Sequence, residues 1–261
     1  MKRLGIFLLI FFLNCSFYSD AAQVATIEQG RELLRTGHYA EAAKVFESLV
    51  GKNSGDQDAQ EGLARARIET GDYQSAEKQL SESLKSDPSA AALRVALGRI
   101  KFDTGRYAEA VAEFERAART AKGAQLLSAR LGHARALRAQ GKDDEARPLL
   151  EGVARYYDEN DPKTAEELTL VAHALVLLEK FRDANDLFID AREADPRFVE
   201  AYVGQGELLN EKYNYGEAAS LFQDALKINP AATAALVGLA ESKRLVSTSE
   251  PAAALERALA V

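Results

Sequence analysis

Apolar residues recur along most of this chain with the spacing of amphipathic helices, in stretches of helix length that short polar turns separate. The stretches come in pairs. The turn inside each of the first three pairs reads Thr-Gly, then any residue, then Tyr. Its glycines are Gly37, Gly71 and Gly105, so the unit repeats every 34 residues. This pattern predicts a chain built from one repeated helix–turn–helix unit.

Weaker copies of the same unit continue along the chain. Their turns lie at residues 140–146, 179–184 and 213–218. In the second, fifth and sixth copies, Asp or Asn followed by Pro88, Pro196 or Pro230 comes directly after the second stretch. Proline cannot donate the helical hydrogen bond, so these dipeptides mark the predicted ends of the second helices.

Two joints between copies are longer than the rest. Residues 121–123 add two residues between the third and fourth copies, and residues 157–162 add four between the fourth and fifth. The repeat resumes at once after each joint. We therefore interpret both as surface loops, or as places where the stack of repeats bends, and not as domain boundaries.

Three positions of the unit keep their residue type. The eighth is always small, as Gly30, Ala64, Gly98, Ala134, Ala172, Gly206 and Ala240. The twentieth is always alanine, as Ala42, Ala76, Ala110, Ala146, Ala184, Ala218 and Ala252. The twenty-fourth is Phe46, Leu80, Phe114, Leu150, Phe188 and Phe222 in the first six copies. Small residues let two helices approach closely, and the larger side chain fills the space against the next copy.

With these residues the chain resembles the tetratricopeptide repeat (TPR) family over residues 23–261, in copies that start near residues 23, 57, 91, 127, 165, 199 and 233. The resemblance implies an all-α fold, a right-handed α-solenoid (superhelix) of about seven two-helix TPR repeats, with a concave groove. One helix pair cannot bury its apolar face alone, so neighbouring pairs must stack. The seventh copy is degenerate, since Ser247 stands where the turn glycine is expected.

Residues 1–21 have the three parts of a secretory signal peptide. Met1–Arg3 is basic, Leu4–Leu13 is an uncharged apolar run, and Ser19–Ala21 places small residues at a cleavage site. The run is too short for a membrane-spanning helix, which needs roughly 20 residues. Asparagine precedes Cys15, where a lipidated bacterial cysteine wants a small residue. We therefore favour export to the periplasm or the exterior over a membrane anchor or an outer-membrane lipoprotein, and we expect no stable membrane span after cleavage.

One row of residues is expected to face the groove, because the family resemblance places the ninth residue of each repeat there. In successive copies this residue is Arg31, Arg65, Arg99, Arg135, His173, Glu207 and Glu241. Arginine binds carboxylates through two parallel hydrogen bonds. We predict that the cationic part of the row binds an extended, partly acidic segment of a partner protein. Those residues are Arg31, Arg65, Arg99, Arg135 and His173.

A second interpretation of this row stays open. Arg65 and Arg99 each have an acid four residues further on, Glu69 and Asp103, with which they can pair on the helix surface. Repeats arise by duplication, so an arginine can also recur through inheritance. Under this interpretation the row is an ordinary solvated surface.

Composition restricts the chemistry of the chain. Its 261 residues include 33 basic and 40 acidic side chains, a net charge of −7, which argues against binding nucleic acid. One cysteine cannot form an internal disulfide. His38, His133 and His173 lie in separate copies without the spacing of a metal site. Because nucleotide-binding and hydrolase motifs are also missing, we predict no catalytic residue, metal or cofactor, and no enzymatic activity.

These observations favour an exported scaffold that binds a protein or peptide in its groove, in bacterial envelope assembly or secretion. The degenerate seventh copy leaves a second class open, the N-terminal interaction module of a longer exported enzyme such as a protease. A cell-wall glycan binder would need aromatic rings along the groove, where only Phe102 and Tyr202 qualify. The Ala- and Leu-rich residues 252–261 also leave self-association through the C-terminal end open.

Overall fold

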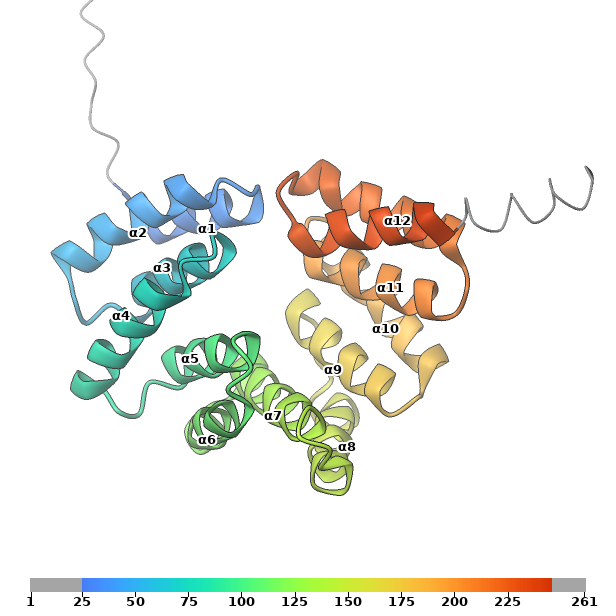
Figure 1. Ribbon diagram of the computed structural model, residues 1–261, viewed down its shortest axis with the longest axis horizontal. Helices are drawn as coiled ribbons and strands as arrows, with labels where there is room; N and C mark the ends of the chain where they lie inside the picture. Colours follow the sequence, from blue (N-terminus) through green and yellow to red (C-terminus); the bar gives the residue numbers. More distant parts are fainter. Residues whose placement is uncertain (1–24, 246–261) are drawn as a thin grey trace, which may run out of the picture.

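A computed structural model describes residues 25–245, in which all regular secondary structure is helical (Figure 1). The first three helix pairs are α1 (Ile27–Arg35) with α2 (Tyr39–Lys52), α3 (Gln57–Glu69) with α4 (Tyr73–Ser86), and α5 (Ala91–Asp103) with α6 (Tyr107–Ala118). The next three are α7 (Gly123–Arg138) with α8 (Asp143–Asn160), α9 (Ala165–Leu177) with α10 (Phe181–Ala194), and α11 (Val199–Glu211) with α12 (Tyr215–Ile228). Residues 233–245 are helical up to the end of the described part. The predicted all-α solenoid is confirmed.

Three predictions lie outside the described residues. They are the signal peptide at residues 1–21, lipidation at Cys15, and the second helix of the seventh copy at residues 252–261.

A left-handed residue ends the first helix of every pair. Gly37, Gly71, Gly105 and Gly141 have φ between 74° and 81°. At the same place in the fifth and sixth pairs, Glu179 and Tyr213 have φ of 61° and 64°. After α1, the amide of His38 donates to Leu33 O at 2.9 Å and that of Gly37 to Leu34 O at 3.2 Å, the two bonds of a Schellman turn. The weaker copies therefore keep the turn without its glycine.

Side chains and prolines fix where several helices begin and end. Thr26, Asp56, Asp72 and Thr164 each accept a hydrogen bond from the backbone amide three residues on, at 3.0–3.2 Å. At their other ends, α4, α10 and α12 stop before Asp87, Asp195 and Asn229. Each of these residues precedes a proline. The Asp-Pro and Asn-Pro dipeptides thus end second helices as predicted.

The second long joint is helical up to Asn160, so the prediction of a surface loop was wrong there, whereas residues 121–122 of the first joint are not helical. Helix α7 begins at Gly123, inside the first joint. Helix α8 continues to Asn160, and the left-handed Asp161 ends it with φ of 46°. The hydroxyl of Tyr156 donates to Glu167 Oε1 of α9 at 2.8 Å, which ties the extended end of α8 to the next pair. Extra residues lengthen a helix here because this contact holds the added turn.

Phenylalanine rings fit against glycines of adjacent first helices. Phe46 lies against Gly30 and Gly62, Phe114 against Gly98 and Gly132, Phe188 against Gly204, and Phe222 against Gly206 and Gly238. A Cβ atom added at any of these glycines would lie 2.3–2.8 Å from a ring carbon, closer than packed atoms can approach. Where the twenty-fourth residue is leucine, as at Leu80, the eighth is alanine, Ala64. The sizes of the facing residues are therefore matched.

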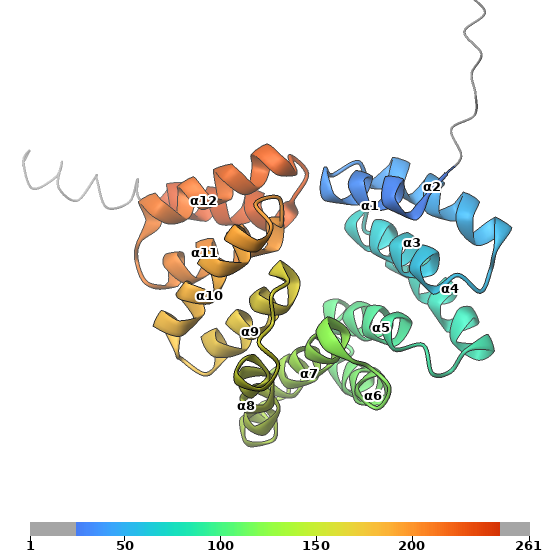
Figure 2. The ribbon, with the colours of Figure 1, turned by 180° about the vertical axis from the view of Figure 1, so that it is seen from behind.

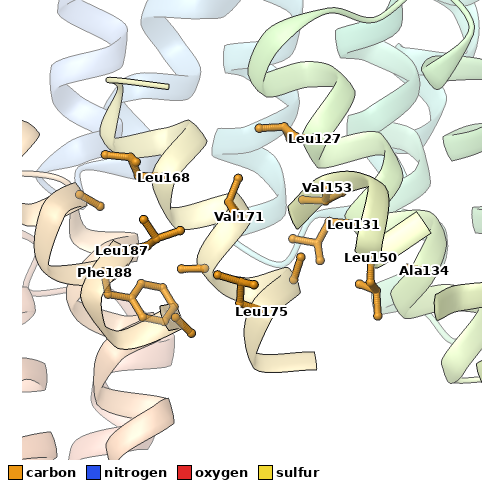
Figure 3. Close-up of a cluster of buried hydrophobic side chains, with 14 of the residues drawn as sticks. Leu127, Leu131, Ala134, Leu150, Val153, Leu168, Val171, Leu175, Leu187 and Phe188 are labelled. Carbon is orange, nitrogen blue, oxygen red and sulfur yellow. The ribbon is translucent and has the colours of Figure 1, made fainter. Parts of the chain in front are cut away.

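Apolar side chains form clusters that extend across neighbouring pairs. In the largest cluster, Leu131 of α7, Leu150 and Val153 of α8, Val171 of α9 and Phe188 of α10 are all buried (Figure 3). Each such side chain contributes about 1.5–3 kcal/mol on burial. Because the cluster crosses pair boundaries, each pair depends on its neighbours for stability.

The stack of pairs curls until its two ends meet. Figures 1 and 2 show the same curled outline from opposite sides, with α1 and α2 facing α12 at its two ends. Side-chain contacts join residues 32–65 to residues 197–231. The described chain is therefore a ring, and its concave surface faces the inside of that ring.

Candidate functional site

The ring closes through a small set of contacts, which we call the seam. On one side lie Glu32, Gly37, Tyr39 and Arg65, and on the other Arg197, Glu200, Asn229 and Ala231. Arg197 forms a salt bridge with Glu32. Arg65 Nη2 lies 2.5 Å from Glu200 Oε1. Asn229 Nδ2 donates to Tyr39 Oη at 2.9 Å. The seam is thus polar, and its charged side chains are about half exposed.

Gly37 is the tightest point of the seam. A Cβ atom there would lie 2.3 Å from Asn229 Oδ1 and 3.0 Å from Ala231 Cβ. The equivalent Gly71 and Gly105 have the same left-handed backbone, and a Cβ atom on either would have no neighbour within 4 Å. The first turn therefore needs glycine for its conformation and also for its contact with the sixth repeat.

Each arginine of the predicted row has a partner within the chain. Arg31 Nη2 lies 3.3 Å from Asp58 Oδ2. Arg65 pairs with Glu200 across the seam. Arg99 lies 3.1 Å from Glu69 Oε1 and 3.6 Å from Asp103 Oδ2. Arg135 Cζ lies 5.9 Å from the ring centroid of Phe102. Binding of an acidic partner by these residues stays a prediction.

His173, the fifth member of the row, does not add positive charge at neutral pH. Burial, together with the neighbouring guanidinium of Arg135, lowers its pKa to about 4. Its ring packs edge-on against Phe188, with the centroids 5.3 Å apart. The cationic part of the row therefore ends at Arg135 when the pH is above that value.

A cavity of about 770 Å³ lies inside the ring. Its walls come from opposite sides: Tyr73 and Arg99 from the second and third repeats, and Glu207, Phe222 and Val237 from the sixth and seventh. A second cavity, of about 190 Å³, is lined by Arg135 and His173 and shares Glu207 with the first. We call the two cavities together the lumen. Three residues of the predicted row thus line the lumen, Arg99 in the larger cavity and Arg135 and His173 in the smaller one.

Four acidic side chains on the first helices of their pairs have raised pKa values. Burial raises the pKa of the Glu61, Asp103, Glu166 and Glu207 carboxyls above their usual values. Nearby arginines oppose this shift, Arg65 for Glu61 and Glu166. Raised pKa values mean that these carboxylates are incompletely compensated, which favours the approach of a cation.

The described residues hold no group of three or more His, Cys, Asp or Glu side chains able to bind a metal ion. Among residues 25–245, none of the helices has the length and apolarity that crossing a bilayer requires. The two groove aromatics are covered by the chain's own cations, Phe102 by Arg135 and Tyr202 by Arg192, whose Cζ lies 5.2 Å from the ring centroid. The arrangement therefore suits recognition of a polypeptide better than stacking on a sugar ring.

The sequence alone did not predict the seam, nor that Glu207 and Glu241 would line a lumen. Arg65 and Glu200 are 135 residues apart, and no local pattern links them. Glu207 and Glu241 did carry a signal, since the predicted row changes from cation to acid at these positions. The acids now share a cavity with Arg99.

Comparisons with known proteins agree with this architecture. A sequence profile of the tetratricopeptide repeat family matches residues 27–80, 62–125 and 170–233, and a second profile of that family matches residues 128–160. Among curated proteins, none matches the chain at a significant level.

Solved structures with the same fold include two bacterial TPR proteins. One, from Parabacteroides merdae, is 18% identical with a TM-score of 0.57, over 83% of this chain and 82% of that one. Another, from Thermus thermophilus, is 18% identical with a TM-score of 0.53, over 70% of this chain and 97% of that one. At this identity the likeness extends to the fold.

Proposed function

This chain belongs to the tetratricopeptide repeat family, and we propose that it is a scaffold that binds an extended segment of a partner protein inside the lumen. The single observation that carries the proposal is the lumen itself, a space of about 770 Å³ in its larger part whose walls come from both ends of the solenoid. A volume of this size is typical of sites that bury most of a ligand. TPR scaffolds serve protein–protein interaction, which agrees with this use of the concave surface.

The lining of the lumen supports a polypeptide ligand. Tyr73 and Val237 provide apolar surface, and Glu207 and Glu241 provide carboxylates that can accept hydrogen bonds from a peptide. Val237 is 61% exposed although it is apolar, and it faces this cavity. Mixed apolar and hydrogen-bonding surface is what alternating side chains and backbone of an extended segment require.

Crosslinking from inside the ring tests this function. We would place a photo-crosslinking amino acid at the position of Val237, and in a matched control at Tyr213, which is 80% exposed and does not line the lumen. We expect position 237 to capture one partner protein in cells that make the chain, and position 213 to capture little of it despite its greater exposure. Equal capture from both positions would contradict binding in the lumen.

We also propose that the chain acts after export, in assembly or secretion at a bacterial cell envelope. The proposal rests on the basic start, apolar run and small residues of residues 1–21. Fractionation of cells that make the chain with and without these residues tests it. We expect the full chain in the periplasmic or external fraction and the shortened chain in the cytoplasm. If both chains stay in the cytoplasm, the envelope role is wrong.

A further inference from the structure

The lumen carries more negative than positive charge. Four acids, Glu69, Glu207, Glu211 and Glu241, line its larger cavity beside one cation, Arg99. The smaller cavity adds Arg135 and no further acid. His173, which also lines it, is neutral at physiological pH. Over both cavities the acids therefore outnumber the cations by two.

The cations of the lumen are already engaged. Arg99 pairs with Glu69 and with Asp103, at 3.1 and 3.6 Å. The guanidinium of Arg135 lies over Phe102, within the electrostatic reach of Asp103 and Glu207. An acidic ligand would have to displace these internal partners before it could bind an arginine.

Two acids of the lumen lack such a partner. Glu211 pairs with Lys212 at 3.0 Å. Within residues 25–245, neither the Glu207 nor the Glu241 carboxylate forms a salt bridge or a side-chain hydrogen bond. Burial raises the pKa of the Glu207 carboxyl, and the neighbouring Arg135 opposes this only in part. An incoming cation would find these two carboxylates available.

Apolar surface lies in the same cavity as these acids. Val237 is 61% exposed and sits on the same helical stretch as Glu241, four residues away. Tyr73 and Ile68 line the opposite wall. In an extended segment, successive side chains point to opposite sides. A segment with basic residues at every second position could thus turn its cations to one wall and its apolar side chains to the other.

From this geometry we propose that the lumen recognises an extended segment in which lysine or arginine alternates with large apolar residues, with the basic side chains paired to Glu207 and Glu241. The inference rests on the function proposed above and specifies the partner's chemistry. It differs from the acidic partner that the arginine row predicted, because the intrachain pairs of those arginines leave the acids as the unpaired charges.

Synthetic peptides test this inference directly. We would use a fluorescent peptide of about seven residues, a length that spans roughly 25 Å when extended, with arginine and leucine in alternation. One control peptide has glutamate in place of arginine, and another has alanine in place of leucine. Fluorescence anisotropy measures binding to the full chain. We expect the arginine–leucine peptide to bind at least about tenfold more tightly than either control, and to weaken as salt screens the charges.

Matched variants locate the binding. Glu207→Gln with Glu241→Gln should lower the affinity for the arginine–leucine peptide about tenfold. Glu82→Gln removes an exposed acid of α4 that does not line the lumen, and should leave the affinity unchanged. Circular dichroism checks that each variant keeps its helices.

The inference is overturned if the arginine–leucine peptide does not bind, if it binds no better than the glutamate peptide, or if the double variant binds it as wild type does. Failure of the inference is separable from failure of the proposed function. Capture of a partner from position 237 would uphold binding in the lumen, even where the peptides show that the partner is acidic.

Discussion

Closure of the ring depends on Gly37, because at this turn, unlike those of Gly71 and Gly105, an added Cβ atom would meet the other end of the solenoid. A single methyl group at this position should therefore open the ring. In Gly37→Ala the added Cβ atom lies 2.3 Å from Asn229 Oδ1, so Asn229 must move. That side chain donates to Tyr39 at 2.9 Å and accepts from the amide of Ala231 at 3.0 Å. Each hydrogen bond contributes about 0.5–1.5 kcal/mol. The substitution therefore costs the closed form about 1–3 kcal/mol.

The other contacts of the seam are too weak to keep the ring closed once these hydrogen bonds are lost. Its two salt bridges, Arg65–Glu200 and Arg197–Glu32, are about half exposed. Exposed pairs are each worth about 0–1 kcal/mol. A loss of about 1.4 kcal/mol changes the ratio of closed to open forms tenfold, so the variant should be largely open.

Gly71→Ala is the matched control. Its φ of 79° equals that of Gly37 within two degrees, and no atom lies within 4 Å of the added Cβ. Both variants therefore carry the same left-handed strain, about 1–2 kcal/mol, and only Gly37→Ala disturbs the seam. A difference between the two variants reports the seam alone.

Double electron–electron resonance, which measures the distance between two spin labels, detects the opening of the ring. One spin label is attached at Lys44→Cys of α2 and the other at Gln223→Cys of α12, so that the two labels lie on opposite sides of the seam. Both substitutions are made in a chain that also carries Cys15→Ser. We expect a narrow distance distribution in wild type and in Gly71→Ala, and a broader, longer one in Gly37→Ala. An unchanged distribution in Gly37→Ala, or equal broadening in both variants, would show that Gly37 does not hold the seam closed.

Two further perturbations test the packing and the electrostatics. Gly62→Ala places a Cβ atom 2.4 Å from the buried ring of Phe46, so it should destabilise the fold by about 1–3 kcal/mol. At Gly152→Ala the atom nearest to the added Cβ lies 3.9 Å away, so this substitution should stabilise the fold by about 0.5–1 kcal/mol. Urea denaturation that finds Gly62→Ala more stable than Gly152→Ala would contradict the matched packing. Hydrogen bonds from Arg106 and Lys101 lower the pKa of Glu77 to about 2, below its unfolded value of 4.5. The ionised Glu77 carboxylate therefore stabilises the fold fully above pH 4.5, and this contribution is lost as the pH falls toward 2. Glu77→Gln should therefore lower the free energy of unfolding by about 1–2 kcal/mol at about pH 7, after allowance for solvent screening. The difference in stability between variant and wild type should disappear between pH 4.5 and 2. A difference that stays constant with pH would show that the charge of Glu77 is not responsible.

The repeat unit could be predicted because its determinants are local. A left-handed turn, small residues at the eighth and twentieth positions and a proline after the second helix each act within a few residues, and Gly71, Ala76 and Pro88 show all three in one copy. The extension of α8 to Asn160 was missed because the contact that holds it, from Tyr156 to Glu167, crosses to the next helix pair.

Closure of the ring could not be predicted from the same residues. It depends on the sum of small rotations between neighbouring pairs, and it joins Arg65 to Glu200 and Tyr39 to Asn229. For the same reason the arginine row was interpreted one helix at a time. Arg65 was expected either to bind a partner or to pair with Glu69 of its own helix, whereas its closest acid lies in the sixth repeat. The sequence showed the change from cation to acid along the row, but the gathering of these charges around the lumen emerged only from the three-dimensional arrangement.

Binding in the lumen is tested most directly by NMR of the methyl groups of the chain while a peptide binds. Ile68 and Val237 line the lumen from opposite walls, and Val45 of the outer helix α2 does not line it. On addition of the peptide that binds most tightly, we expect the signals of Ile68 and Val237 to shift together and saturate together, while that of Val45 stays in place. Shifts confined to Val45 and to residues of the other outer helices would place the partner on the convex surface and contradict binding in the lumen.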